Sequence, residues 1–391
     1  MNLIHPELGS AYAKISTGAG WDSKKDTYFE FVLAHDLHGR PSGSHIISPR
    51  LSLSEQHSTA HRAHFLDELV KLVPSYIVEF GKRLKDVRRH VDDRRTIIEF
   101  ADGTVAEAHA VIGCDGIRSV CRDFVLGKNN PLSVPIFTGK HAYRGLIPME
   151  KAVTAIGAEK AQNRFMFLGE GGHVLVFPVA GGKIMNVVAF SDTEGGIWEG
   201  DWVKPMNRSK MSMDFHNFGE ECQNIFSVIL GCLEPQSINP YLLTSSVQLM
   251  ENTDHWAIFD LSEDIPTFVD PSLHLVLLGD SAHACAPHQG AGAGQALEDA
   301  YILSRMIGDC SSTSDLLAAF FGYDSVRRPR TRFVQQHGRR QGELLDLQRP
   351  DVGTDLEKLK AVVDVPIREI WNCDLLAELD KARTAMNAYR M

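Results

Sequence analysis

Two pairs of short apolar runs give the clearest strand pattern in the chain. The first pair, TIIEF and TVAEAHAVIG, lies at residues 96–113 around the turn-forming dipeptide Asp102-Gly103. The second pair, HVLVFPV and IMNVVAF, flanks a short AGGK segment within a β-rich zone of residues 143–191. The pattern predicts a hairpin or strand pair at 96–113, and an antiparallel pair in a separate sheet at 173–190.

Helical spacing of apolar residues marks three other regions. Residues 58–74 place apolar side chains at helical intervals and end in a proline, which predicts a helix that stops there. A helix is also expected near 218–233, and the chain from Leu316 onward is expected to be largely helical, with breaks at 349–350 and near 365–366. The basic cluster at 82–90 is expected to be a solvated helix end.

The order of these segments predicts an α/β protein. Segments of β/α character come first, an antiparallel region follows, and a further β/α segment precedes the terminal helices. This order indicates a nucleotide-binding domain into which a sheet domain is inserted. A chain of 391 residues is long enough for such an arrangement.

Composition narrows the class of protein. The chain is 43% hydrophobic and 23% charged, as in ordinary soluble proteins, and its net charge is −10. No basic stripe offsets the excess acid, so neither a nucleic-acid nor a membrane partner is expected. The seven cysteines form no CxxC pair, and neither a signal peptide nor a membrane-spanning apolar stretch is found. We therefore expect reduced thiols and a cytoplasmic location.

The most informative segment is residues 273–300, LHLVLLGDSAHACAPHQGAGAGQALEDA. An apolar strand ends at Gly279-Asp280, a loop follows, and a Gly/Ala-rich stretch opens a helix. Asp280 is therefore placed to accept a hydrogen bond from a sugar-like hydroxyl. The backbone amides of Gly292–Gly294 lie at a helix N-terminus, which stabilises negative charge. Both features suit the polar edge of a large planar cofactor.

A second motif, Cys114-Asp115-Gly116, directly follows the apolar strand HAVIG. A glycine there lets the backbone approach a ligand closely, while the aspartate accepts hydrogen bonds. The alternative is an ordinary Asp-Gly turn. The Gly/Ala-rich helix start also has a second interpretation, in which its small residues only allow tight packing between helix and strand.

Two histidines of the long segment, His283 and His288, lie five positions apart with Pro287 between them. They share no helix face and no third ligand is evident, so no metal site is predicted. For His288, the alternative to a chemical role is a loop histidine that only hydrogen-bonds the backbone.

These motifs resemble those of a known family. Asp115-Gly116 and Gly279-Asp280, in this order and separation, are similar to the paired motifs of the single-component (group A) FAD-dependent aromatic monooxygenases. The stretch 287–300 most resembles salicylate hydroxylase and its fungal phenol-hydroxylating relatives. The resemblance covers nearly the whole chain, and it implies a Rossmann-like FAD-binding domain with an inserted antiparallel β-sheet substrate domain and a helical C-terminus.

The resemblance also implies an activity and its co-substrates. In that family NAD(P)H reduces FAD, O2 forms a flavin C4a-hydroperoxide, and one oxygen is added to a phenolic or salicylate-like ring, in degradative or secondary metabolism. The ring reacts as a phenolate, so the site needs a base or a cation. His288 is the first candidate for the base, and Pro287 would stiffen its loop. Arg144 and His173 are expected to contact the substrate.

The residues expected to bind the flavin lie at strand ends or helix starts. They are Arg62, Asp115, Gly116, Asp280, Gly290, Gly292, Ala293 and Gly294. Related flavoproteins fit less well, because the five tryptophans show no WxWxIP pattern of a flavin halogenase. An epoxidase of membrane lipids would be expected to carry an apolar anchor, and none is seen.

The implied domains divide the chain into four ranges. Residues 1–135 and 263–330 would form the two parts of the FAD-binding domain, 136–262 the substrate-binding sheet, and 331–391 the helical region. The family begins with a strand–GxGxxG–helix unit that holds the FAD pyrophosphate, and this chain shows none, so its FAD-binding domain is expected to be N-terminally incomplete. We therefore expect an exposed sheet edge and exposed apolar surface. Either the start is misassigned or truncated, or a short, catalytically inactive product does not hold FAD.

Overall fold

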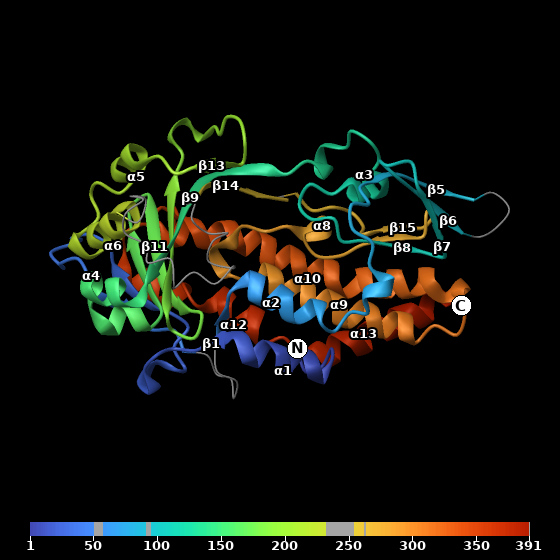
Figure 1. Ribbon diagram of the computed structural model, residues 1–391, viewed down its shortest axis with the longest axis horizontal. Coiled ribbons are helices and arrows are strands. Elements are labelled where there is room, and N and C mark those ends of the chain that lie inside the picture. The colour runs from blue at the N-terminus through green and yellow to red at the C-terminus, as the bar shows by residue number, and fades with distance from the viewer. Residues whose placement is uncertain (51–57, 91–94, 232–253, 262, 391) are drawn as a thin grey trace.

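The computed structural model describes residues 1–50, 58–90, 95–231, 254–261 and 263–390. The molecule is elongated, with a large sheet and its helices at one end and two small sheets at the other (Figure 1). Long helices from the C-terminal third of the chain run along its length. This is an α/β fold with a helical C-terminus, as the sequence predicts.

The large sheet has eight strands. In spatial order they are β13 (Val203–Pro205), β14 (Asp254–Asp260), β9 (Ile136–Pro148), β12 (Ile184–Asp192), β11 (Gly172–Val179), β10 (Phe165–Gly169), β2 (Glu30–Leu33) and β3 (His45–Ile47). The predicted antiparallel pair is confirmed as β11 and β12. Two early strands, β2 and β3, join this sheet, with β2 parallel to β10. The division of the chain at 136, 263 and 331 remains a proposal.

The two faces of this sheet have different neighbours. One face packs against α4 (Met149–Gln162), α5 (Arg208–Asp214) and α6 (Glu220–Gly231), in a core that includes Val174, Val187 and Tyr143. The helix expected near 218–233 is confirmed as α6, with residues 232–233 outside the described part of the chain. Side chains alternate along a strand, so His173 and Arg144 lie on the opposite face.

The other end of the molecule holds two three-stranded sheets. One has the order β15 (Val269–Asp270), β16 (Leu275–Leu277), β8 (Val111–Gly113), and β16 runs parallel to β8. The other consists of β5 (Leu84–Arg89), β6 (Thr96–Phe100) and β7 (Val105–Ala108). The predicted hairpin is confirmed as β6 and β7, and Gly103 in its turn has a φ of 83°, which favours glycine.

The prediction of a helix end at 82–90 is wrong, because β5 occupies this segment. Val87 is buried and Leu84 packs partly against the same core, while Lys85 and Arg88 are exposed, and the segment pairs antiparallel with β6. Lys85 pairs across the sheet with Glu99 at 2.5 Å.

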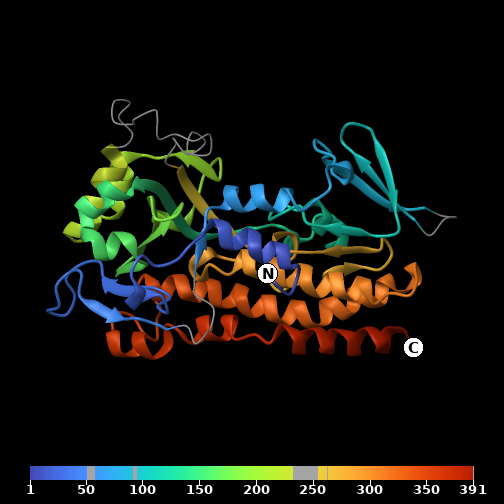
Figure 2. The ribbon, with the colours of Figure 1, turned by 60° about the horizontal axis from the view of Figure 1, so that its bottom comes forward.

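Three long helices run along the molecule: α9 (Gly292–Gly308), α10 (Leu316–Leu345) and α13 (Leu375–Arg390). Two helices of seven residues each, α11 (Leu356–Val362) and α12 (Val365–Trp371), lie in sequence between α10 and α13. Figure 2 shows α9, α10 and α13 layered on one another, and α10 packs against both of the others. With 30 residues, α10 is about 45 Å long and reaches from the small sheets to the large one. The break expected at 349–350 is confirmed between α10 and α11.

The helix expected at 58–74 is shorter than predicted, as α2 (Arg62–Val70). It is preceded in the chain by α1 (Pro6–Ile15), which packs against it. Apolar side chains in and after α2 are exposed, including Val70 (64%), Tyr76 (87%) and Phe80 (87%). Ile112 on β8, an edge strand among the described residues, is also exposed.

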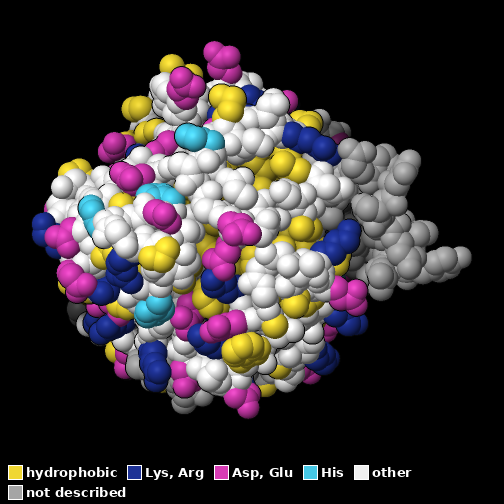
Figure 3. Space-filling view, turned by 90° about the vertical axis from the view of Figure 1, so that its left-hand side faces the viewer, with side chains coloured by type: hydrophobic (Ala, Val, Ile, Leu, Met, Phe, Trp, Pro, Cys, Tyr) yellow, Lys and Arg dark blue, Asp and Glu magenta, His cyan; other side chains and the backbone are white. Residues whose placement is uncertain are grey.

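The surface shows no segregation of charge on the end that carries the large sheet. Acidic and basic side chains are interspersed across that face (Figure 3). Within the described ranges, no helix combines the length and the apolar character that crossing a bilayer requires. The cysteines that the structure describes are free thiols.

Candidate active site

The turn after β16 exposes a carboxylate beside a helix start. Gly279 adopts φ 67° and ψ −142°, and Asp280 opens the short helix α8 (Asp280–His283) with its side chain exposed. No hydrogen bond engages the Asp280 carboxylate among the described residues. Nearby in sequence, α9 begins at Gly292 without a side-chain cap, so its first amides lack an internal partner. Ala293 and Gly294 are exposed, and space beside Gly294 is open.

A buried ionic cluster holds this turn in place. Asp299 on α9 accepts hydrogen bonds from Gly279 N (2.9 Å), His283 Nε2 (2.5 Å) and Arg327 Nε (2.7 Å). Burial raises the pKa of Asp299, but His283 and Arg327 outweigh it, so the carboxyl pKa lies below its ordinary value. His283 therefore acts in the structure as a partner of Asp299 and orients the Gly279 turn.

Arg327, on α10, is fully buried and holds a second carboxylate as well. Its Nη1 donates to Glu298 Oε2 at 2.6 Å, and its Nη2 donates to Gln295 Oε1 at 2.8 Å. Sequence reasoning missed this arginine, because its partners lie about 30 positions away and no local motif marks it. The LEDA stretch at 297–300 could have indicated such a cation. It places two acidic residues, Glu298 and Asp299, on a helix that packs on the core, where carboxylates require positively charged partners.

Asp115 has a structural task. Its carboxylate accepts hydrogen bonds from Ser119 Oγ (2.5 Å), Val120 N (2.7 Å) and Cys121 N (3.0 Å), and thereby caps α3 (Val120–Leu126). Gly116 has a φ of 80°, a conformation that favours glycine. The motif therefore builds the turn after β8, and its contact with a cofactor remains a proposal.

Aromatic and basic side chains share the face of the large sheet that lies away from α4, α5 and α6. The strand register aligns His173 with Phe190, and Phe190 with Ala142, in one row across β11, β12 and β9. Arg144 lies in the next row on the same face. Its guanidinium lies 5.7 Å from the centre of the Trp256 ring. Burial lowers the pKa of Arg144, the Asp254 carboxylate acts in the opposite direction, and the charge of Arg62 lowers it further.

His288 lies over this face. It belongs to the short helix η6 (Pro287–Gln289), and its ring centre is 4.7 Å from that of Phe190 and 5.3 Å from that of His173. Burial, and then His173, lowers the pKa of His288 to about 3. The ring is therefore neutral at ordinary pH and can accept a proton only if the charge is stabilised elsewhere.

A chain of ionic contacts continues from His173. Its Nδ1 lies 2.5 Å from Asp346 Oδ1, at the end of α10. The other oxygen of Asp346 accepts from Lys140, and Lys140 Nζ also donates to Asp192 at 2.6 Å. Burial raises the pKa of Asp346, but His173 and Lys140 more than offset it and leave it below its ordinary value. Sequence reasoning missed Asp346, which stands between two leucines with no motif around it.

The structure thus groups the predicted residues in two places. His288 and His173 lie together against the sheet face that also carries Arg144. Asp280 and the start of α9, with Gly292, Ala293 and Gly294, form the exposed turn, and Gly290 adopts the left-handed conformation (φ 62°) between the two places in sequence. Pro287 opens η6 and is exposed.

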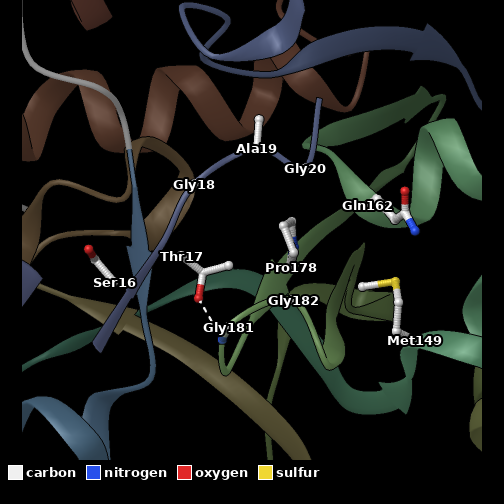
Figure 4. A pocket seen from close by; sticks show the side chains of 10 residues that line it. All are labelled: Ser16, Thr17, Gly18, Ala19, Gly20, Met149, Gln162, Pro178, Gly181 and Gly182. Carbon is white, nitrogen blue, oxygen red and sulfur yellow. Dashed lines mark hydrogen bonds between the residues drawn. The ribbon is translucent and has the colours of Figure 1, made fainter. Parts of the chain in front are cut away.

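A separate pocket of about 440 Å³ lies at the far end of β11 (Figure 4). It is bounded by β1 (Ser16–Thr17), the Gly18–Gly20 segment and the turn after β11, where Gly181 N donates to Thr17 Oγ1 at 3.0 Å. Its lining contains no titratable side chain, and Pro178 on its wall is five residues, or about 17 Å, from His173. This pocket is therefore not the candidate site.

Known proteins resemble this chain throughout. It is 34% identical to salicylate hydroxylase of Pseudomonas putida over 97% of this chain and 82% of that protein. It is 40% identical to the FAD-dependent monooxygenase pigN of Monascus ruber, over 81% of this chain and 70% of that protein. The chain belongs to the FAD-dependent aromatic monooxygenases of the salicylate hydroxylase type. No family model matches it.

Solved structures agree with this assignment. A salicylate hydroxylase substrate complex superposes with a TM-score of 0.79 at 33% identity, covering 96% of this chain and 88% of that one. CtdE, at 16% identity, has a TM-score of 0.74 and shares the fold. The comparisons give no support to the alternative of an inactive homologue.

The residues of this monooxygenase fit the polar edge of a flavin. An unengaged carboxylate at the start of α8 (Asp280) and uncapped amides at the start of α9 (Gly292–Gly294) supply an acceptor and donors. A methyl group built on Gly290 or Gly294 would meet nothing within 4 Å, so the turn is open to a ligand. The Asp280 carboxylate would accept hydrogen bonds from the ribityl hydroxyls. The amides at the start of α9 would donate to the N1/C2 carbonyl edge.

Gly342 on α10 is predicted to be indispensable for the position of His288. A Cβ at this position would lie 2.7 Å from His288 Cδ2 and 2.8 Å from Nε2. Gly342→Ala gains about 1 kcal/mol of helix propensity but must displace the ring. We expect turnover to fall about tenfold with the fold retained, measured by steady-state kinetics and circular dichroism. Gly308→Ala, where space is open, should leave turnover unchanged; equal turnover in both variants would contradict the prediction.

Proposed function

We propose that this monooxygenase uses NAD(P)H and O2 to hydroxylate a phenolic or salicylate-like aromatic ring. The observation that carries the proposal is a buried, neutral His288 over the same sheet face as Arg144. Together they offer a proton acceptor and a cation for an acidic aromatic compound. Two relatives support the substrate class by name, salicylate hydroxylase and, at 36% identity, the 6-methylsalicylate 1-monooxygenase of Aspergillus terreus.

Each group has a separate role in the proposal. Bound FAD supplies the redox chemistry that activates oxygen. Asp280 and the amides at the start of α9 hold its polar edge, and Arg62, Asp115, Gly116 and Gly290 complete the cofactor contacts. Pro287 keeps the loop that carries His288 rigid.

Arg144 would hold the anionic group of the substrate. Its side chain is exposed beside the Trp256 ring and carries a positive charge, so a carboxylate or phenolate is the kind of group with which it would pair. His173 lies one row away and would line the ring-binding face. We further propose a cytoplasmic location and the four-part domain division.

The proposed activity is tested directly with the purified chain. FAD is added, and the oxidation of NADH or NADPH is followed with salicylate and with phenol while the aromatic product is identified by mass spectrometry. We expect nicotinamide oxidation that depends on the aromatic compound and yields a product with one added oxygen. Protein that binds FAD but neither oxidises NAD(P)H nor changes any phenolic compound would contradict the proposal.

Asp280→Ala tests the flavin contact. Losing an acceptor for a ligand hydroxyl removes a charge-assisted hydrogen bond, worth about 1.5–3 kcal/mol. We therefore expect the Kd for FAD to rise about tenfold or more, measured by quenching of flavin fluorescence. The control is Asp380→Ala, which removes an exposed carboxylate on α13. An unchanged Kd in Asp280→Ala would show that this carboxylate does not contact the flavin.

A further inference from the structure

The sheet face that carries Arg144 also holds a buried asparagine whose side chain has no protein partner. Asn186 on β12 is only 7% exposed. Among the described residues, no hydrogen bond engages its carboxamide. A carboxamide offers both donors and acceptors, and buried side-chain polar atoms almost always have a partner. The side chain of Asn186 therefore indicates a ligand at this place on the sheet.

The strand register sets Asn186 diagonally opposite Arg144. Arg144 on β9 pairs with Val188 on β12, and Leu146, two positions further along β9, pairs with Asn186. Side chains two positions apart point to the same face, so these four residues form a square, the Arg144–Asn186 square. Diagonal neighbours across two antiparallel strands lie about 7–8 Å apart, a distance that one ligand can bridge.

The other two corners of the square are apolar. Val188 and Leu146 are half-buried, and neither belongs to the hydrophobic clusters that the described residues form on the two faces of the sheet. Apolar surface of this kind suits an aromatic ring, because contact with the ring removes both from water. A ring over these two side chains would place one substituent at each polar corner.

We propose that Asn186 selects aromatic acids that carry a second oxygen substituent meta or para to the acid group. Arg144 pairs with the acid group, and the carboxamide of Asn186 hydrogen-bonds the second oxygen at the opposite corner. Salicylate alone does not meet this requirement, because its hydroxyl and carboxylate stand on neighbouring ring carbons and reach the same corner. The inference rests on the proposed function and deepens it, since it names the substituent pattern of that substrate class.

Three ligands that differ at one ring position test the proposal. They are 2,4-dihydroxybenzoate, 4-methylsalicylate, which has a methyl group in place of the second hydroxyl, and salicylate, which has hydrogen there. Isothermal titration calorimetry of the purified chain with FAD added measures the Kd of each. The native chain should bind 2,4-dihydroxybenzoate at least about tenfold more tightly than 4-methylsalicylate, because the methyl group leaves the buried carboxamide unpaired.

The variant Asn186→Leu, which keeps the branching of the side chain and removes its polar atoms, should abolish this preference. The matched control is Asn224→Leu. Asn224 lies on α6, on the other side of the sheet, where its Nδ2 donates to Ala155 O at 3.3 Å. Asn224→Leu should keep the native preference. Thermal unfolding confirms that each variant is folded, and Asn186→Ser, whose hydroxyl is too short to reach the same oxygen, replaces Asn186→Leu if that variant does not fold.

The outcomes separate this inference from the proposed function. Equal affinity of the native chain for 2,4-dihydroxybenzoate and 4-methylsalicylate, or the native preference retained in Asn186→Leu, would overturn the role of Asn186 and leave the monooxygenase proposal intact. An equal loss of preference in Asn224→Leu would assign the effect to general loosening and overturn it as well. A chain that shows the expected preference but hydroxylates none of the ligands would overturn only the proposed activity. A native chain that binds none of the three would overturn both.

Discussion

Replacement of Arg327 by methionine should lower the free energy of unfolding by about 3–5 kcal/mol, because it leaves the buried carboxylate of Asp299 without its cation. Asp299 is fully buried, and Arg327 supplies both a charge and a hydrogen bond at 2.7 Å. Urea denaturation followed by tryptophan fluorescence measures the change. The Gly279 turn depends on the same carboxylate, so the affinity for FAD should fall with stability.

A surface arginine provides the comparison. Arg383→Met removes a pair with Asp309 at 2.8 Å in which both side chains are substantially exposed, and exposed pairs contribute at most about 1 kcal/mol. Equal losses in the two variants would mean that the Arg327 cluster adds nothing beyond an ordinary surface pair.

Replacement of His288 by asparagine should lower kcat by about 10²–10⁴-fold, the usual contribution of a positioned general base. The comparison is His255→Asn. His255 is also buried, with its pKa lowered to about 3 chiefly by burial, but it stacks on Tyr143 at the helix-facing side of the sheet. His255→Asn should leave kcat within a few-fold of the native value. A similar loss of kcat in both variants would show that the effect comes from disturbed packing and not from a general base.

The depressed pKa of His288 also fixes the sign of its effect on stability. In the unfolded chain the ring takes up a proton as the pH falls below 6.5, whereas the folded protein resists this until about 3. The unfolded state then binds more protons, so the free energy of unfolding falls as the pH is lowered. Native His288 should contribute about 2 kcal/mol of this loss between pH 7 and pH 5, and His288→Asn should lack that part.

Local patterns were enough to predict two strand pairs, β6–β7 and β11–β12, and the terminal helices. The turn at Asp102-Gly103 and the paired runs of β11 and β12 depend only on neighbours in sequence, and both are confirmed. The segment of β5 was misassigned because its two apolar residues, Leu84 and Val87, are three positions apart among charged ones and show no strand period. Pro329 inside α10 gives no break, since packing on α9 and α13 supports the helix around it.

The site was predicted less completely, because its decisive partners are distant in sequence. His288 and Arg144 were named from motifs, but Asp346 and Arg327 follow only from the way α10 crosses the molecule. Asp115 shows the opposite case. Its motif was recognised, while the three hydrogen bonds by which it caps α3 depend on the path of the following turn.

One helix supplies contacts to both halves of the site. Arg327, Gly342 and, just past its last residue, Asp346 are fixed by their order along α10, where each residue turns the helix by about 100°. Inserting or deleting a single residue between Arg327 and Gly342 would rotate one group away from its partner, whatever residue type was added. We therefore expect this stretch of α10 to tolerate changes of residue type far better than changes of length.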